Sequence, residues 1–290
     1  MSDAAIRVGV IGGSGLYEIE ELTDRREVTV DTPFGPPSDR LLVGRLEGLE
    51  VAFLPRHGRG HRLLPTELNF RANIWALKSL GVEWIISASA VGSLDGNVRP
   101  LDVVVPDQFI DRTRHRVDTF FGDGLVAHVS LADPVCSVLR GVLVESLREV
   151  GARVHDGGTY LCMEGPQFST RAESNLYRAW GATVIGMTNL QEARLAREAE
   201  ICYATLALVT DWDCWKDDED PVSVDAVVER LGRNARTARE TVRRAVGRLP
   251  ERRECACARA LDTAIITPRD LVPEETIRRL GPVVARVLGR

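Results

Sequence analysis

The chain has 290 residues, 44% of them hydrophobic and 27% charged, so it can bury a sizeable core and lacks the polar bias of a disordered protein. Lysine and arginine total 37 against 42 aspartates and glutamates, and the formal charge of −5 argues against nucleic acid as a partner. The sequence shows neither a signal-like N-terminus nor a long uncharged apolar run, so we expect a cytoplasmic protein with no membrane association.

The first half of the sequence predicts short strands and one clear helix. An apolar run at Ile6–Ile11 leads into the turn Gly12-Gly13-Ser14-Gly15, and turn residues then separate a meander of strands between Val28 and Leu54. Apolar residues at helical spacing predict a helix over Asn69–Leu80, and a strand follows at Trp84–Ile86.

The second half alternates strands with helices, which predicts an α/β fold built on a largely parallel sheet. The predicted elements are a strand at Val103–Val105, a helix near Ala132–Val150, a strand at Thr159–Met163, a helix at Arg171–Trp180, a strand at Thr183–Ile185, a helix at Gln191–Glu198 and a strand at Cys202–Thr210.

An amphipathic stretch at Val222–Leu249 predicts a surface helix that breaks near Gly232. Its arginines alternate with glutamates, which favours a solvated helix face over a binding patch. No internal repeat or linker interrupts the sequence, so we expect one domain over residues 1–290, with a helical C-terminal segment from about residue 222.

Six cysteines scattered over a long chain favour reduced, buried thiols over a disulfide framework. The closest pair is Cys255-Ala256-Cys257, whose spacing is tighter than that of an ordinary zinc half-site and which has no partner pair in the sequence. We therefore expect no metal site and a structural or incidental role for this pair, with a strained redox-active disulfide as the alternative.

Three segments that follow strands carry groups suited to binding an anion. The turn Gly13-Ser14-Gly15 lacks the last glycine of a dinucleotide fingerprint and the Walker lysine, so a plain turn and an anion cradle both stay open. The segment Arg56–His61 places cationic donors at a strand end, which favours an oxyanion site over a metal site or an unliganded loop. The small residues of Ser87–Ser93 either admit a phosphate or allow close strand–helix packing.

Two further segments could recognise a flat, polar ligand. Phe168 lies between turn residues after a strand, where its ring stacks on a ligand or joins the core. Asp211 and Asp213 end an apolar run at positions that face the same way in an extended chain. They bind a metal, cap a helix or, with one carboxyl protonated, recognise the amine and ring nitrogen of adenine.

Together these segments resemble the trimeric purine nucleoside phosphorylases, and within that family most closely the S-methyl-5′-thioadenosine phosphorylases. The resemblance spans almost the whole chain and rests on ten blocks in order, namely Ile11–Tyr17, Asp31–Asp39, Arg56–His61, Asn69–Gly81, Ala88–Leu94, Asp107–Thr113, Glu164–Ser174, Gly186–Asn189, Ala196–Ala204 and Thr210–Trp215.

The resemblance implies a single-domain α/β fold in which helices flank a mixed central sheet. It implies a homotrimer with active sites near the subunit interfaces, and it leaves a hexamer open. It further implies a small-molecule nucleoside as substrate, inorganic phosphate as co-substrate, and neither a metal nor an organic cofactor.

The resemblance also assigns roles to individual residues of this chain. Phosphate would be bound by Ser14, Arg56, His57, Ser89, the backbone of Ala90, and Thr188. The nucleoside would contact Phe168 and Ser169 near the purine, Met187 under the ribose, Asp211 and Asp213 on the adenine edge, Val224, Val227 and Val228 around the methylthio group, and His128 of a neighbouring subunit.

The implied reaction is the phosphorolysis of S-methyl-5′-thioadenosine to adenine and 5-methylthioribose 1-phosphate, a step of purine and methionine salvage. Asp211 would be the catalytic acid, because a protonated carboxyl can donate to purine N7 as negative charge develops on the base. One alternative is a phosphorylase for 6-oxopurine nucleosides or methylthioinosine, and a second is an adenosine-binding protein without catalytic activity.

Overall fold

The computed structural model describes residues 6–13, 16, 19–216 and 224–289, and for 224–229 the backbone alone. Its strands are β1 (Val8–Gly12), β2 (Thr23–Val28), β3 (Leu41–Leu46), β4 (Leu49–Pro55), β5 (Trp84–Ser93), β6 (Val103–Val105), β7 (Gln108–Arg112), β8 (Val154–Asp156), β9 (Thr159–Met163), β10 (Val184–Gly186) and β11 (Cys202–Asp211). Its helices are α1 (Phe70–Ser79), α2 (Ser137–Glu149), α3 (Arg171–Ala179), α4 (Asn189–Glu198), α5 (Val224–Arg248), α6 (Glu274–Leu280) and α7 (Ala285–Leu288).

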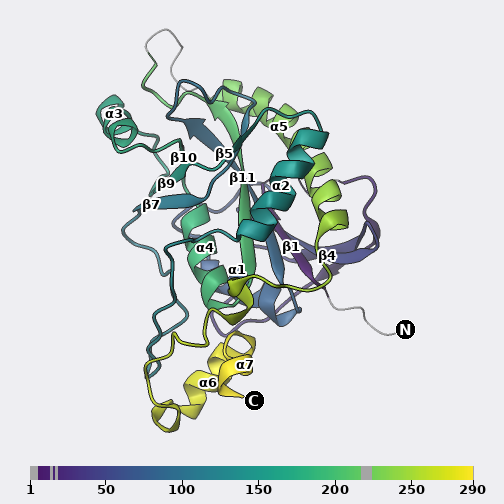
Figure 1. Ribbon diagram of the computed structural model, residues 1–290, viewed down its shortest axis with the longest axis vertical. Coiled ribbons are helices and arrows are strands. Elements are labelled where there is room, and N and C mark those ends of the chain that lie inside the picture. Colours follow the sequence, from purple (N-terminus) through teal and green to yellow (C-terminus); the bar gives the residue numbers. More distant parts are fainter. Residues whose placement is uncertain (1–5, 14–15, 17–18, 217–223, 290) are drawn as a thin grey trace.

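A mixed sheet of all these strands forms the centre of the molecule (Figure 1). Strand β5 is central to it and pairs with β1, β10 and β11. Strands β4, β1, β5 and β11 run parallel to one another. The C-terminal end of β5 pairs antiparallel with β10. Strands β2, β3 and β4 form an antiparallel meander. The expected α/β fold with a mixed sheet flanked by helices is confirmed.

Alternating side chains of the parallel strands face two helical layers. On one face, Val10 and Ala204 pack with α2 and α5, which lie side by side. On the other face, Ile85 and Tyr203 pack with α1 and α4. Both faces are covered, which explains why these strands read as continuous apolar runs rather than alternating ones.

Several elements differ from the sequence prediction. The small residues that were expected to close a strand at Ile86 instead continue β5 to Ser93, because β11 pairs with that strand over its whole length. Helix α5 runs through Gly232 without a break, since an isolated glycine weakens a helix by only about 1 kcal/mol. Strands β2, β7 and β8 were not predicted, and helices α6 and α7 were anticipated only as part of a helical C-terminal segment. Among the described residues, no helix is long and apolar enough to span a bilayer.

The C-terminal segment after α5 packs against α2 and β11 near the residues that begin them. There the fold brings Cys136 and Cys202 beside Cys255 and Cys257. The expectation that the Cys255–Cys257 pair has no partners is therefore wrong, because the partners come from distant parts of the chain. All six cysteines have free thiols.

Candidate active site

Three predicted anion-binding segments meet where β1 and β4 end, beside the middle of β5. The pairing aligns Gly12 with Pro55 and Ile11 with Ser87, so the segments that follow are neighbours. The backbone N–H of Arg56 donates to the carbonyl oxygen of Gly12 at 2.9 Å. Ser14, which follows this turn, lies outside the described residues. We call Arg56, His57, Ser89, Ala90 and Thr188 the anion end of the site.

Arg56 is buried and forms an ion pair with Glu192 of α4. Its Nε lies 2.5 Å from the Glu192 Oε1, and its Nη2 lies 3.2 Å from Oε2. Nη2 also donates to the Ser87 hydroxyl at 2.6 Å, and Nη1 donates to the Ala88 carbonyl at 2.8 Å. A guanidinium has five N–H donors, and these contacts leave one Nη1 hydrogen for a ligand. The pair raises the pKa of Arg56 against the effect of burial, so its charge is retained.

Asn189, at the start of α4, connects the rest of the anion end to this ion pair. Its amide donates to the Ser87 hydroxyl at 3.1 Å. Its Oδ1 accepts from the hydroxyls of Thr188 and Tyr160, each at 3.1 Å. The Tyr160 oxygen in turn lies 3.4 Å from the hydroxyl of Ser89. Arg56, Ser89 and Thr188 are thus held by one buried network.

His57 lies at the edge of this network, and its Nδ1 is 2.8 Å from the carbonyl oxygen of Leu63. A carbonyl only accepts, so Nδ1 carries the proton and donates. Burial and the positive charge of Arg56 lower the pKa of His57 to about 4. The imidazole is therefore neutral at pH 7, with Nε2 as a lone-pair acceptor. The ring of His61 stacks on it with centroids 4.3 Å apart.

Asp211 and Asp213 lie together over the backbone of Gly92 in β5. A Cβ on that glycine would be 2.9 Å from the Asp211 Oδ1 and 3.3 Å from the Asp213 Cβ, so a larger residue there would displace the aspartates. Asp211 ends β11, but Asp213 lies in a turn with a φ of 53°, not in the extended chain that the sequence predicted. The pair stays together because the N–H of Asp213 donates to the Asp211 Oδ1 at 2.8 Å.

Burial raises the pKa of both carboxyls above the usual range for aspartate. The Thr210 hydroxyl and the Asp213 N–H donate to Asp211 and offset part of this effect, while the charge of Asp213 adds to it. A carboxyl with a raised pKa keeps its proton to a higher pH, and a protonated carboxyl can donate a hydrogen bond where an ionised one only accepts.

The loop after β9 packs against these aspartates. The Cys214 thiol donates to the carbonyl oxygen of Ser169 at 3.2 Å. Gly165 lies so close to Met187 that a Cβ would be 2.5 Å from its sulfur. Phe168 belongs to the same loop and is 54% exposed, so it is not a core residue. We call Phe168, Ser169, Met187, Asp211 and Asp213 the carboxylate end of the site.

The buried side chain of Arg116 holds this loop and the segment after β10 together. It donates to the carbonyl oxygens of Glu164 and Met187 and to the Gln191 side chain. Neither Arg116 nor the Glu192–Asn189 network was predicted. Little in the sequence indicates these buried contacts, because single polar residues on a helix or in a loop usually face water.

The remaining predicted residues are not gathered here. His128 is exposed, and its N–H donates to the carbonyl oxygen of Ala264 at 2.8 Å. The side chains of Val224, Val227 and Val228 lie outside the described residues. The structure therefore brings together the anion end and the carboxylate end, whereas the roles given to all these residues remain predictions.

Comparison with known proteins identifies the family. The family described as Phosphorylase superfamily matches residues 7–247. An S-methyl-5′-thioadenosine phosphorylase from Koribacter versatilis is 59% identical over 97% of this chain and 97% of its own length. One from Geobacter sulfurreducens is 58% identical over 96% of this chain and 97% of its own length.

Solved structures agree with this match. A methylthioadenosine phosphorylase from an antarctic soil metagenomic library has a TM-score of 0.93 at 50% identity, covering 97% of this chain and 99% of that chain. One from Schistosoma mansoni, in complex with adenine, has a TM-score of 0.83 at 37% identity, covering 89% and 96%. The family resemblance seen in the sequence is confirmed, and the chain belongs to the phosphorylase superfamily.

Proposed function

We propose that this protein catalyses the phosphorolysis of S-methyl-5′-thioadenosine, which gives adenine and 5-methylthioribose 1-phosphate. The observation that carries the proposal is the Asp211–Asp213 pair, at least partly buried and with raised pKa values. It lies at one end of a site whose other end carries the buried cation Arg56. The relatives named above as S-methyl-5′-thioadenosine phosphorylases support it.

At the carboxylate end, protonated Asp211 donates to N7 of the purine, and Asp213 accepts from the 6-amino group. As the N-glycosidic bond lengthens, electrons move onto the base, and the proton offered to N7 stabilises the developing negative charge. Phe168 stacks on the purine ring and Met187 lies under the ribose.

At the anion end, inorganic phosphate attacks C1′ of the ribosyl group and replaces the leaving adenine. Arg56 offers its unused Nη1 hydrogen and its charge. The hydroxyls of Ser89 and Thr188 now donate within the protein at 3.2 and 3.1 Å, and phosphate, a stronger acceptor, takes over both donors. A phosphate dianion also favours protonation of His57 Nε2, which then donates to it. The reaction uses phosphate as co-substrate and no metal or organic cofactor.

A homotrimer fits the position of His128, which is exposed and whose N–H bonds to Ala264 rather than to a residue of the site. In the proposed assembly His128 reaches the 5′ pocket of a neighbouring subunit, and Val224, Val227 and Val228 complete that pocket. Two trimers pairing into a hexamer is the alternative assembly. We place the protein in the cytoplasm, where its nucleoside substrate is available.

The test is chromatographic product analysis of the purified protein with methylthioadenosine, adenosine, methylthioinosine and inosine, each with and without phosphate. We expect adenine to form fastest from methylthioadenosine, and only when phosphate is present. Hypoxanthine as the preferred product would move the assignment to 6-oxopurine nucleosides. Absence of cleavage from all four nucleosides would favour an adenosine-binding protein.

A further inference from the structure

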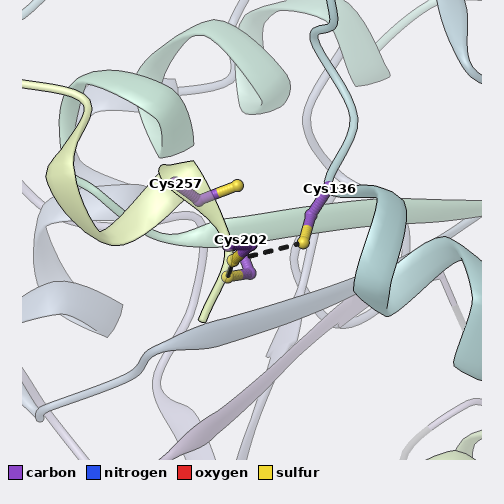
Figure 2. A group of neighbouring side chains, drawn as sticks. Cys136, Cys202 and Cys257 are labelled. Carbon is purple, nitrogen blue, oxygen red and sulfur yellow. Dashed lines mark hydrogen bonds between the residues drawn. The ribbon is translucent and has the colours of Figure 1, made fainter. Parts of the chain in front are cut away.

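Four cysteine sulfurs converge at one point between the sheet and the C-terminal segment (Figure 2). The Sγ atoms of Cys136, Cys202, Cys255 and Cys257 all lie within 4.8 Å of one another. The Cys255 sulfur is 3.7 Å from that of Cys136 and 3.2 Å from that of Cys202. Three of the four residues are buried, and Cys255 is partly exposed.

The ligands come from three separate, well-anchored segments. Cys202 is the first residue of β11, and Cys136 is the N-cap of α2. The N–H of Cys136 donates to the carbonyl oxygen of Tyr203 at 2.9 Å, which holds these two segments together. Cys255 and Cys257 lie at the start of a short 3₁₀ helix in the C-terminal segment. Figure 2 shows Cys136, Cys202 and Cys257 reaching the same point from their own segments.

We propose that Cys136, Cys202, Cys255 and Cys257 form a tetrathiolate site for Zn²⁺. Zinc in structural sites is tetrahedral with Zn–S distances of about 2.3 Å, which places the four sulfurs about 3.8 Å apart. The sulfur–sulfur distances here, 3.2 and 3.7 Å for the two contacts of Cys255 and at most 4.8 Å for any pair, differ from that spacing by about 1 Å or less. Binding displaces the thiol protons, so four thiolates hold the ion and the protons pass to solvent.

A disulfide is the competing chemistry for the same sulfurs. A disulfide joins two sulfurs at about 2.05 Å, which is well below the separations seen here. A pair of disulfides would use the cysteines two by two, whereas here Cys255 lies near both Cys136 and Cys202. One ion satisfies four convergent thiolates at once, and reduced thiols in a reducing compartment bind metals rather than forming disulfides.

The zinc site would stabilise the C-terminal segment that contacts the backbone of Ala127 and His128. A few residues after Cys257, Ile265 bridges to Ala127, and the carbonyl oxygen of Ala264 accepts from the His128 N–H. The described contacts also tie this segment to Glu200, whose carboxylate accepts from the Leu261 N–H at 3.0 Å. Metal binding stabilises the folded form of the segment that binds it, so the ion would hold residues 255–267 in place.

The first experiment measures metal in the full-length protein, purified with a reducing agent and without chelator, by elemental mass spectrometry. We expect about one zinc ion per chain. Replacing zinc with Co²⁺ should produce thiolate-to-cobalt charge-transfer bands and the intense d–d bands of a tetrahedral site. The double variant Cys255→Ser/Cys257→Ser should retain less than about one-tenth of an ion per chain. The matched control Cys162→Ser, a buried cysteine outside the cluster, should retain the metal.

A second measurement tests the segment itself by hydrogen exchange before and after chelation. We expect residues 255–267 to exchange at least about tenfold faster without zinc, while β5 is unchanged. The proposal is overturned if the wild-type protein holds no zinc as purified and retains none after incubation with one equivalent of Zn²⁺ and dialysis. It is also overturned by iron in place of zinc, or by an intact mass lower by four hydrogens, which indicates two disulfides. These readouts on the wild-type protein decide the matter even if the double variant does not fold.

Discussion

The anion end and the carboxylate end of the site are built in opposite ways. Arg56 and Thr188 are each 3% exposed, and one hydrogen-bond network joins them to Glu192 and Asn189 of α4. At the carboxylate end, Phe168 is 54% exposed and Asp213 lies in a turn with positive φ. The sheet and helix α4 hold the residues of the anion end in position, whereas most residues of the carboxylate end are positioned by loops.

We expect this difference to divide the effects of substitutions, with changes in stability at the anion end and changes in substrate specificity at the carboxylate end. The charge of Arg56 is held in place by buried partners, and Ser89 and Thr188 belong to the same hydrogen-bond network, so the proposed phosphate site is largely preorganised. Changes there should disturb the fold as well as the reaction. The carboxylate end can change its ligand contacts with little effect on the core, as expected for loops placed on a rigid scaffold. The following predictions test this separation.

The largest effect is expected from Arg56→Ala. Removing the guanidinium leaves the Glu192 carboxylate buried without its cation, which should lower the free energy of unfolding by about 3–5 kcal/mol. Denaturant unfolding measures this loss. If the variant folds, the KM for phosphate should rise about tenfold to a hundredfold, since a hydrogen bond to a charged group contributes about 1.5–3 kcal/mol.

The matched control is Glu192→Gln, which keeps an oxygen acceptor for Arg56 and removes the charge of its partner. This variant should also lose stability, but its KM for phosphate should rise less than that of Arg56→Ala, because the guanidinium remains. Phosphate kinetics in a folded Arg56→Ala protein that match the wild type would remove Arg56 from the phosphate site.

The next largest effect is expected from Asp211→Asn. The amide keeps the shape of the side chain and can exchange hydrogen bonds with Thr210, but it has no acidic proton to share with the purine. We expect kcat for methylthioadenosine to fall by about 10²–10⁴-fold, the usual contribution of a general acid, with little change in thermal stability.

The double variant Asp211→Asn/Asp213→Asn sharpens this test. It replaces both acids with amides and should weaken the preference for methylthioadenosine over methylthioinosine, because an amide can donate to a 6-carbonyl oxygen. The exposed residue Asp270 gives a matched control, and Asp270→Asn should leave kcat and the preference unchanged. An unchanged preference in the double variant would contradict the role of the pair in purine selection.

Helix α4 carries two glutamates in different surroundings, one beside the anion end and one away from it. Glu192 is paired with Arg56, whereas the Glu198 carboxylate accepts from the Thr119 hydroxyl at 2.8 Å and the Phe120 N–H at 2.6 Å. Burial raises the pKa of Glu198 to about 7 despite these bonds. The folded protein therefore binds this proton more tightly than the unfolded chain, and the stability it contributes is lost as pH rises from about 4.5 to about 7.

Replacing Glu198 with glutamine, which is neutral at every pH and keeps an oxygen acceptor, removes this dependence. Relative to wild type, Glu198→Gln should gain stability between pH 5 and pH 8 by up to about 3 kcal/mol. Thermal unfolding of both proteins across this range measures the difference, in which the titration of all other groups cancels. A difference that stays constant with pH would show that Glu198 is ionised throughout.

Local patterns were sufficient to predict the fold class, and they placed some candidate site residues at strand ends. Arg56 follows the last residue of β4 and Asp211 ends β11, and ends of parallel strands meet at one edge of a sheet. Arg56 and Asp211 could therefore be expected at the same edge of the sheet without knowing which strands pair, whereas Ser89 lies within β5.

Long-range partners could not be predicted. Arg56 and Glu192 are 136 positions apart, and a glutamate on an amphipathic helix normally faces water. The cysteines that join Cys255 are 119 and 53 positions away, so no spacing rule would find the cluster. The turn at Asp213 also escaped prediction, because its positive φ depends on the contact with Asp211 rather than on a glycine.

The smallest effect is expected from Phe168→Ala at the carboxylate end. Stacking of a base on an aromatic ring contributes about 1–3 kcal/mol, so the KM for methylthioadenosine should rise by about tenfold to a hundredfold. Because the ring is 54% exposed, the midpoint of thermal unfolding should hardly change. Phe168→Tyr keeps the aromatic face and should restore most of the affinity. If Phe168→Ala instead lowers stability and leaves the affinity unchanged, Phe168 packs within its loop and does not bind the purine. The contrast between a rigid anion end and an adaptable carboxylate end would then not hold for Phe168.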